Sequence, residues 1–369
     1  MLFPMKSCTL ILALILTIAP LFAQPTQTAK NDAPCDEYLK TPLPAEAQEV
    51  NAPKTWPACD SYKSYSGLGR KVDFQAARKC AWAERLAQQA DIQPKYTVES
   101  VFGGSAMLAV LYANGEGVEQ NYRLAMRFAC EAGGAPAEIN IRLEHLESLR
   151  TKPATQIKFD FCNDITSGFM EGFCAARSSD LAEQERVIAS NTLKTAMTAA
   201  QRQTFASLVK AQETYSQAHG SGEIDLGGTA RAMYEIDAEQ TLREDFLAAI
   251  RAYEKGQGLP SGSTNDYHDA DEHLNTAYHK AIADAEAHKT EYGAIQPAGI
   301  RNAERAWLKY RDAWVEFTKL RYPHIPPEAW LTLLTRNRTT ILDGSFCEMD
   351  DVEGKCAWQG DTWKPSPLP

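Results

Sequence analysis

The chain lacks an apolar run long enough to span a membrane, and its longest such run lies at the N-terminus. That run covers residues 8–22, short of the roughly 20 apolar residues that a spanning helix needs. Lys6 precedes it and a polar stretch begins at Gln24, which is the layout of a secretory signal peptide. We therefore expect a signal peptide over residues 1–23, cleaved after Ala23, and an exported mature protein without a membrane span.

A lipid-anchor cysteine is also missing. In a lipoprotein the modified cysteine follows the apolar run, whereas Cys8 lies at its start. The sequence therefore favours a freely soluble periplasmic protein over a lipid-anchored one.

Closely spaced zinc-type cysteine pairs do not occur, because no two cysteines stand as near as C-x-x-C. Removal of Cys8 with the signal leaves an even number of cysteines, which predicts disulfides in an exported chain. They are Cys35, Cys59, Cys80, Cys130, Cys162, Cys174, Cys347 and Cys356. The sequence leaves their pairing open. Sequence proximity favours Cys35–Cys59, Cys162–Cys174 and Cys347–Cys356, which leaves Cys80–Cys130.

Positive charge is in deficit. The formal net charge is −10, and loss of Lys6 with the signal brings the mature chain to about −11, one charge lower. An acidic protein binds nucleic acid poorly but can attract basic proteins. The same charge also serves plain solubility.

Reactive motifs are absent as well. No G-x-S-x-G element marks a hydrolase serine. His268, His273 and His279 are spaced by five and six residues, which puts them on different faces of a helix and not in the i, i+4 arrangement of a zinc protease. Acidic residues are plentiful, so a glycosidase carboxylate pair stays open, but none stands out. We expect no enzyme activity, no cofactor and no metal.

The chain does contain a proline-rich leader over residues 24–66, in which the prolines break helices.

An internal duplication with an offset of 48 residues follows the leader. Gly67, Gly69, Asp73, Phe74 and Ala77 align with Gly115, Gly117, Asn121, Tyr122 and Ala125. Repeats of this length predict stacked helical units. Each Gly-x-Gly should turn the chain, and Asp73 or Asn121 should cap the next helix.

The second copy, residues 105–134, resembles the Sel-like repeat, a relative of the tetratricopeptide repeat. The matched positions are Tyr112, Gly115, Gly117, Val118, Tyr122, Ala125, Ala132 and Gly133. This resemblance implies paired antiparallel helices over residues 67–150 and a concave surface for protein contacts, near Tyr112 and Tyr122. The first copy has no clear preceding helix, so we expect one and a half to two units.

Long amphipathic helices dominate the chain beyond Phe159. Residues 296–317 carry an apolar stripe with alternating spacings of three and four, formed by Ile300, Ala303, Trp307, Tyr310, Trp314 and Phe317. Such a stripe indicates one buried helix face. We therefore expect Trp307 and Trp314 in the core. Similar stripes occur at residues 274–282 and 205–215.

These helices resemble the LprI-type lysozyme inhibitor family. The matched residues are Asp271, Leu274, Asn275 and Tyr278 in one helix and Ala303, Trp307, Tyr310, Arg311 and Asp312 in the next. Residues 161–176 resemble the opening of that domain, and Ala211, Gln212 and Tyr215 echo Ala303, Glu304 and Trp307. Thr241, Arg243 and Leu247 echo Thr335, Arg338 and Leu342. Trp314 occupies a place where the family usually has a cysteine.

We therefore expect two diverged copies of this domain within about residues 160–345, at 158–256 and 264–345, followed by a C-terminal tail at 346–369. The predicted fold class is all-α: a short Sel-like solenoid, then helical hairpin or bundle domains, stapled by disulfides.

The LprI resemblance implies a secreted protein that blocks a muramidase, and the acidic net charge favours a cationic one. A muramidase cleft cleaves through two carboxylates, so donors on a protruding loop could block it. Two segments have suitable chemistry: residues 219–223, with His219, Ser221 and Glu223, and residues 258–265. Both also fit ordinary helix connections. An immunity protein against a cell-wall-targeting effector and an envelope scaffold remain the alternative functions.

Overall fold

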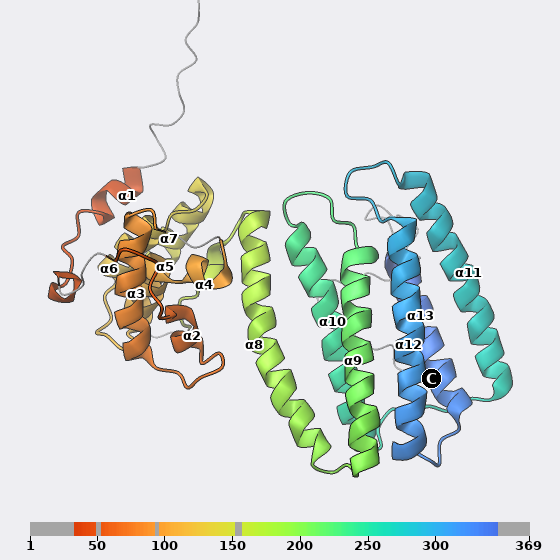
Figure 1. The fold of residues 1–369 in the computed structure, drawn as a ribbon. Coiled ribbons are helices and arrows are strands. Elements are labelled where there is room, and N and C mark those ends of the chain that lie inside the picture. Colours follow the sequence, from red (N-terminus) through yellow and green to blue (C-terminus); the bar gives the residue numbers. More distant parts are fainter. Residues whose placement is uncertain (1–32, 49–52, 93–95, 152–156, 346–369) are drawn as a thin grey trace, which may run out of the picture.

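The computed structural model describes residues 33–48, 53–92, 96–151 and 157–345, and within these ranges every regular element is helical. An N-terminal unit of short helices lies beside a bundle of six long helices (Figure 1). The all-α prediction is confirmed. Residues 1–32 and 346–369, and with them the predicted signal peptide, C-terminal tail and Cys347–Cys356 pair, lie outside the described residues.

The N-terminal unit is built from seven α-helices. These are α1 (Ala33–Tyr38), α2 (Ser61–Ser66), α3 (Phe74–Gln89), α4 (Val98–Phe102), α5 (Gly104–Asn114), α6 (Tyr122–Ala132) and α7 (Pro136–Thr151), with a 3-10 helix η2 (Ala45–Gln48) after α1. Helix α5 is at its centre: residues 104–113 are all buried. It packs against α3 on one side and α6 on the other.

The duplicated segments have the same local geometry. Asp73 caps α3 by accepting from Ala76 N, and Asn121 caps α6 by accepting from Leu124 N. The Asp73 amide donates to Ser64 O at 2.8 Å, and the Asn121 amide donates to Tyr112 O at 2.9 Å. The predicted caps are confirmed. The first copy does have a preceding helix, the short α2, which the sequence did not predict.

Three disulfides occur among the described cysteines, and only one of them is a pair expected from proximity in the sequence. Cys162–Cys174 is confirmed. The pairs Cys35–Cys59 and Cys80–Cys130 are wrong, because the structure has Cys35–Cys130 and Cys59–Cys80. The reason is that α1 packs on α6, whereas α2, which begins two residues after Cys59, packs on α3. The leader is therefore bonded to both repeat helices and not to itself.

The bundle comprises α8 (Gly168–Lys194), α9 (Ala199–Gly222), α10 (Arg231–Glu254), α11 (Thr264–His288), α12 (Pro297–Arg321) and α13 (Pro327–Ser345). A 3-10 helix η3 (Phe161–Asp164) precedes α8 and is tied to it by Cys162–Cys174. Helix α8 is the bundle helix that lies next to the N-terminal unit (Figure 1). The Gly69 amide donates to Gln184 Oε1 on α8 at 3.0 Å, which links the two parts.

Helices α9 and α12 form the most extensive contact at the centre of the bundle, with α8 packed on α10 and α11 packed on α13 at the two sides. The predicted stripe on α12 points inward: Ile300, Ala303, Trp307, Trp314 and Phe317 are all buried, and Tyr310 is half-buried. Trp314 stacks on Trp330 of α13. The core role predicted for Trp307 and Trp314 is confirmed.

Candidate functional site

A buried ionic cluster fixes the centre of the bundle. Arg338 of α13 is fully buried, and its Nη1 donates to Glu223 Oε2 at 2.8 Å and to Tyr215 OH at 3.2 Å. Its Nε donates to Glu304 Oε2 at 3.0 Å. His219 Nδ1 lies 2.9 Å from Glu223 Oε2. The guanidinium therefore connects α13 with α9 and α12.

The two carboxyl groups of this cluster have shifted pKa values of opposite sign. Burial would raise the pKa of Glu223, but the charge of Arg338 and hydrogen bonds from Arg338 and His219 outweigh it, so its pKa is lowered. Burial raises the pKa of Glu304, and Arg338 offsets this rise only in part. Arg338 thus has one carboxylate, that of Glu223, held firmly in the charged form.

The segment 219–223 is not the protruding loop that the sequence predicted. It forms the last turn of α9, with Glu223 as the C-cap. His219 and Glu223 are buried, and only Ser221 is exposed. A Cβ at Gly220 would lie 2.8 Å from Glu235 O, so this glycine allows α10 to approach α9 closely. His219 and Glu223 are thus placed inside the bundle. Residues 258–263 do belong to the connection between α10 and α11.

Six of the nine residues that match the LprI-type family line a groove of about 330 Å³ between α11 and α12: Asp271, Leu274, Asn275, Tyr278, Trp307 and Arg311. Asn275 and Tyr278 of α11 face Trp307 and Arg311 of α12 across this groove. The Arg311 guanidinium lies 5.4 Å from the Trp307 ring centre and pairs with Asp312 at 3.0 Å.

Two further guanidinium groups, those of Arg301 and Arg305, line the same groove, which could therefore bind carboxylates. Tyr310, another of the matched residues, instead stacks on Tyr215 in the core, with ring centres 5.5 Å apart. The family motif thus builds both the groove and the packing beneath it.

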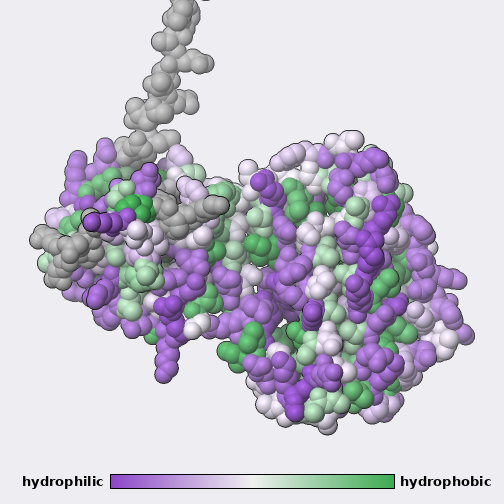
Figure 2. All heavy atoms as spheres, in the orientation of Figure 1, coloured by the Kyte–Doolittle hydropathy of each residue, from purple (hydrophilic) through white to green (hydrophobic). Residues whose placement is uncertain are grey.

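Two loops between helices lie at the end of the bundle where α12 begins, which is also the end that holds Arg301. Residues 223–230 join α9 to α10, residues 289–296 join α11 to α12, and both are at the upper end in Figure 1. The Leu226 amide donates to Gly293 O at 3.0 Å, so the two loops are bonded to each other. Tyr292 projects from the second loop with 80% of its surface exposed. The surface around this part of the bundle is largely hydrophilic in Figure 2.

In the N-terminal unit, the two predicted contact tyrosines differ in exposure. Tyr112 is buried, and its hydroxyl donates to Glu46 Oε1. Tyr122 is half-buried, and its hydroxyl accepts from Gln120 Nε2 at 3.1 Å. Tyr112 is therefore a core residue and is not open to a partner.

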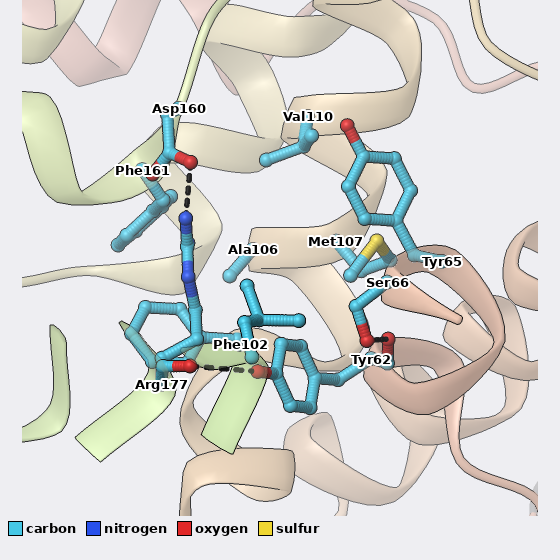
Figure 3. A pocket seen from close by; sticks show the side chains of 11 residues that line it. Tyr62, Tyr65, Ser66, Phe102, Ala106, Met107, Val110, Asp160, Phe161 and Arg177 are labelled. Carbon is cyan, nitrogen blue, oxygen red and sulfur yellow. Dashed lines mark hydrogen bonds and ion pairs between the residues drawn. The ribbon is translucent and has the colours of Figure 1, made fainter. Parts of the chain in front are cut away.

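A cavity of about 200 Å³ lies where the N-terminal unit meets α8 (Figure 3). Tyr62, Phe102 and Phe161 line it, and the Tyr62 hydroxyl donates to Arg177 O at 3.5 Å. Arg177 in turn pairs with Asp160. The polar groups at this cavity bond to one another, so it is a packed junction with an apolar interior.

No group of three or more histidine, cysteine or acidic side chains is placed to hold a metal ion among the residues that the structure describes. His268, His273 and His279 are all exposed on α11. Nor does any helix in the described ranges have the length and apolar character needed to cross a membrane.

The sequence reasoning missed Arg338 as the centre of the ionic cluster and Tyr292 as the most exposed large apolar side chain of the described bundle. Arg338 carried a weak signal, an arginine four residues from Leu334 and from Leu342 and so on the same helix face as both. Tyr292 carried a better one, because Tyr-Gly between two long helical patterns marks a turn with an aromatic at its apex.

Comparison with known proteins finds a family match in the second half of the bundle. No curated protein and no solved structure matches the chain. Residues 261–340, which hold α11, α12 and most of α13, match the family described as Lysozyme inhibitor LprI.

Proposed function

We propose that the protein inhibits a lysozyme-type peptidoglycan hydrolase by binding it. The observation that carries this proposal is the match of residues 261–340 to a lysozyme inhibitor family. That segment supplies the groove, the loop with Tyr292 and the arginine of the buried cluster. The net charge, near −11 without the signal, suits a cationic partner and should mainly raise the association rate.

The proposal includes two diverged copies of the inhibitor domain. Helices α8, α9 and α10 pack among themselves as α11, α12 and α13 do: the first helix of each set lies on the third, and the middle helices α9 and α12 meet at the centre. This arrangement supports a first copy at residues 158–256 and a second at 264–345. Only the second falls within the family match.

The N-terminal unit is proposed to be a pair of Sel-like repeats, and the protein to be periplasmic. The equal capping geometry of Asp73 and Asn121 supports the repeats. The disulfides and the apolar run at residues 8–22 support export to an oxidising compartment.

A lysis assay tests the main proposal. Purified mature protein is added to c-type, g-type and i-type lysozymes acting on a bacterial cell-wall suspension, and turbidity is followed. We expect inhibition of at least one type at micromolar protein, with slower association at higher salt. Absence of both binding and inhibition against all three types would contradict the proposal.

An envelope scaffold is the second candidate. It is favoured by an exposed aromatic pair where α8 begins: Tyr96 is 73% exposed and Phe169 is 57% exposed, with ring centres 6.1 Å apart. Exposed paired aromatics are typical of protein contacts. Co-purification of resident envelope proteins that is lost in a Phe169→Ser variant would favour this role.

A further inference from the structure

The loop between α11 and α12 presents Tyr292 at the apex of a tight turn. The Ala294 amide donates to Glu291 O at 3.3 Å, which closes a four-residue turn. Gly293 has φ of +81° at the third position, where a type II turn requires a positive φ. Tyr292 therefore occupies the second position, with its side chain directed away from the loop and 80% exposed.

This turn is held from both sides. Gln296 Nε2 donates to Lys289 O at 3.1 Å and to Ala294 O at 3.0 Å, which closes the base of the loop. On the other side, a Cβ at Gly293 would lie 2.2 Å from Gly227 Cα, so the loop of residues 223–230 lies directly against it. The exposed tyrosine is thus presented on a braced backbone, which reduces the entropy lost on binding.

Charged groups on the same loops and on the adjoining helix ends suit a cationic partner with an acidic cleft. Asp225, Glu286 and Glu291 are exposed at this end of the bundle. Arg301, one turn into α12, has a side chain that is 45% exposed. Its nearest described carboxylate, Glu286, is 3.8 Å away and pairs more closely with Lys289, at 3.0 Å. The Arg301 guanidinium therefore has donors available for another carboxylate.

We propose that this braced tip, formed by the loops at residues 223–230 and 289–296, enters the substrate cleft of a cationic muramidase. Tyr292 fills a sugar subsite, and Arg301 donates to a cleft carboxylate. The inference rests on the proposed function. A cleft that cleaves through two carboxylates is concave and acidic, so a projecting ring with a nearby guanidinium complements it in shape and charge. Rigid aromatic and arginine anchors are also the residues that most often dominate binding energy.

Two variants and two matched controls test the tip with the full mature chain and purified c-type lysozyme. Tyr292→Ala and Arg301→Gln remove the proposed anchors. Tyr234→Ala removes another exposed tyrosine, 47% exposed on α10, and Arg336→Gln removes another exposed arginine, on α13. We expect each tip variant to raise the dissociation constant at least tenfold, and each control to stay within about twofold. Circular dichroism should show the same helix content in all four.

Competition provides a readout that needs no variant. Tri-N-acetylchitotriose occupies the sugar subsites of the lysozyme cleft, so it should displace the protein competitively. Competition together with a loss in the tip variants supports the inference. If the wild-type protein inhibits while Tyr292→Ala inhibits equally well, or while the trisaccharide and the protein bind together, the tip is not the inhibitory element and the inhibitor function stands. If the wild-type protein does not bind the lysozyme, both fail.

Discussion

Arg338 and Glu223 form a fully buried ion pair, although 115 residues separate them in the chain. Arg338 belongs to α13, within the segment that matches the inhibitor family, and Glu223 ends α9, outside it. Burial of two charges is unfavourable unless they are paired and hydrogen-bonded. The pair therefore joins the two halves of the bundle at one defined geometry, at the end of α9 from which the loop of residues 223–230 begins.

Removal of the negative partner should destabilise the bundle strongly. Glu223→Gln leaves the buried Arg338 charge with only Glu304, whose pKa is raised by burial. We expect a loss of about 3–5 kcal/mol in the free energy of unfolding, because breaking a buried pair leaves an uncompensated charge. Urea denaturation followed by circular dichroism measures it.

The matched control is Glu213→Gln, the same change on the same helix. Glu213 pairs with Arg243 at 2.7 Å, but its side chain is 43% exposed. A partly exposed pair should contribute less than about 1 kcal/mol. Equal losses in the two variants would show that burial does not set the strength of the Arg338–Glu223 pair.

The same pair predicts a pH dependence of known sign. The pKa of Glu223 is lowered from its ordinary 4.5 in the folded state, so its stabilising contribution is present above that value. The contribution is lost as the pH falls through the lowered folded value. The pKa of Glu304 is raised in the folded state. Its ionisation therefore lowers the free energy of unfolding as the pH rises above about 4.5. The stability difference between wild type and Glu223→Gln should therefore be largest near neutral pH and shrink as the pH falls below the ordinary pKa of 4.5. A difference independent of pH from 7 to 3 would contradict this.

Disulfide mapping under non-reducing conditions should recover Cys35–Cys130, Cys59–Cys80 and Cys162–Cys174. The first closes a separation of 95 residues and the last one of 12. By chain entropy, replacement of Cys35 and Cys130 together by serine should cost about 4.5 kcal/mol, against about 3 kcal/mol for Cys162 and Cys174. Recovery of a Cys35–Cys59 peptide would contradict the observed pairing.

Local patterns predicted much of this fold, since helix periodicity and capping act over a few residues. The stripe at Trp307 and Trp314 and the caps at Asp73 and Asn121 are examples. The disulfides show the limit of such reasoning. Proximity in sequence favoured Cys35 with Cys59, but α1 packs on α6, and no local signal encodes that packing.

The candidate site was harder to predict for a similar reason. Glycine and serine at residues 220–222 have weak helix propensity and therefore indicated a loop. Tertiary packing overrides this preference, because Gly220 lies against the α10 backbone and Glu223 bonds to Arg338. Tyr292 is the exposed residue at this end of the bundle. What distinguishes it from other surface tyrosines is that the loop of residues 223–230 packs against its own loop. The sequence alone does not reveal that contact between loops.

Truncation of Trp307 should test the core that underlies the groove. Trp307 is 2% exposed and packs with Ile300, Leu274 and Leu342. We expect Trp307→Ala to lower the free energy of unfolding by about 3–5 kcal/mol through cavity formation. Leu320→Ala, at a 44% exposed position on the same helix, is the control and should change it by less than about 1 kcal/mol. A Trp307→Ala variant that melts like wild type but no longer binds lysozyme would make Trp307 a contact residue and not a core residue.

Gly293 offers a way to separate the bracing of the tip from the chemistry of Tyr292. Gly293→Ala leaves the tyrosine in place, but its Cβ would lie 2.2 Å from Gly227 Cα, so the two loops must move apart. Gly256→Ala is the matched control: Gly256 also has a positive φ, of +71°, yet a Cβ there meets nothing within 4 Å. Both variants carry the backbone cost of a left-handed alanine, about 1–2 kcal/mol. Only Gly293→Ala should also lose inhibition of the lysozyme, by tenfold or more, when both are assayed at a temperature where circular dichroism shows them folded. Equal inhibition by the two variants would mean that the contact between the loops does not hold Tyr292 in its binding position.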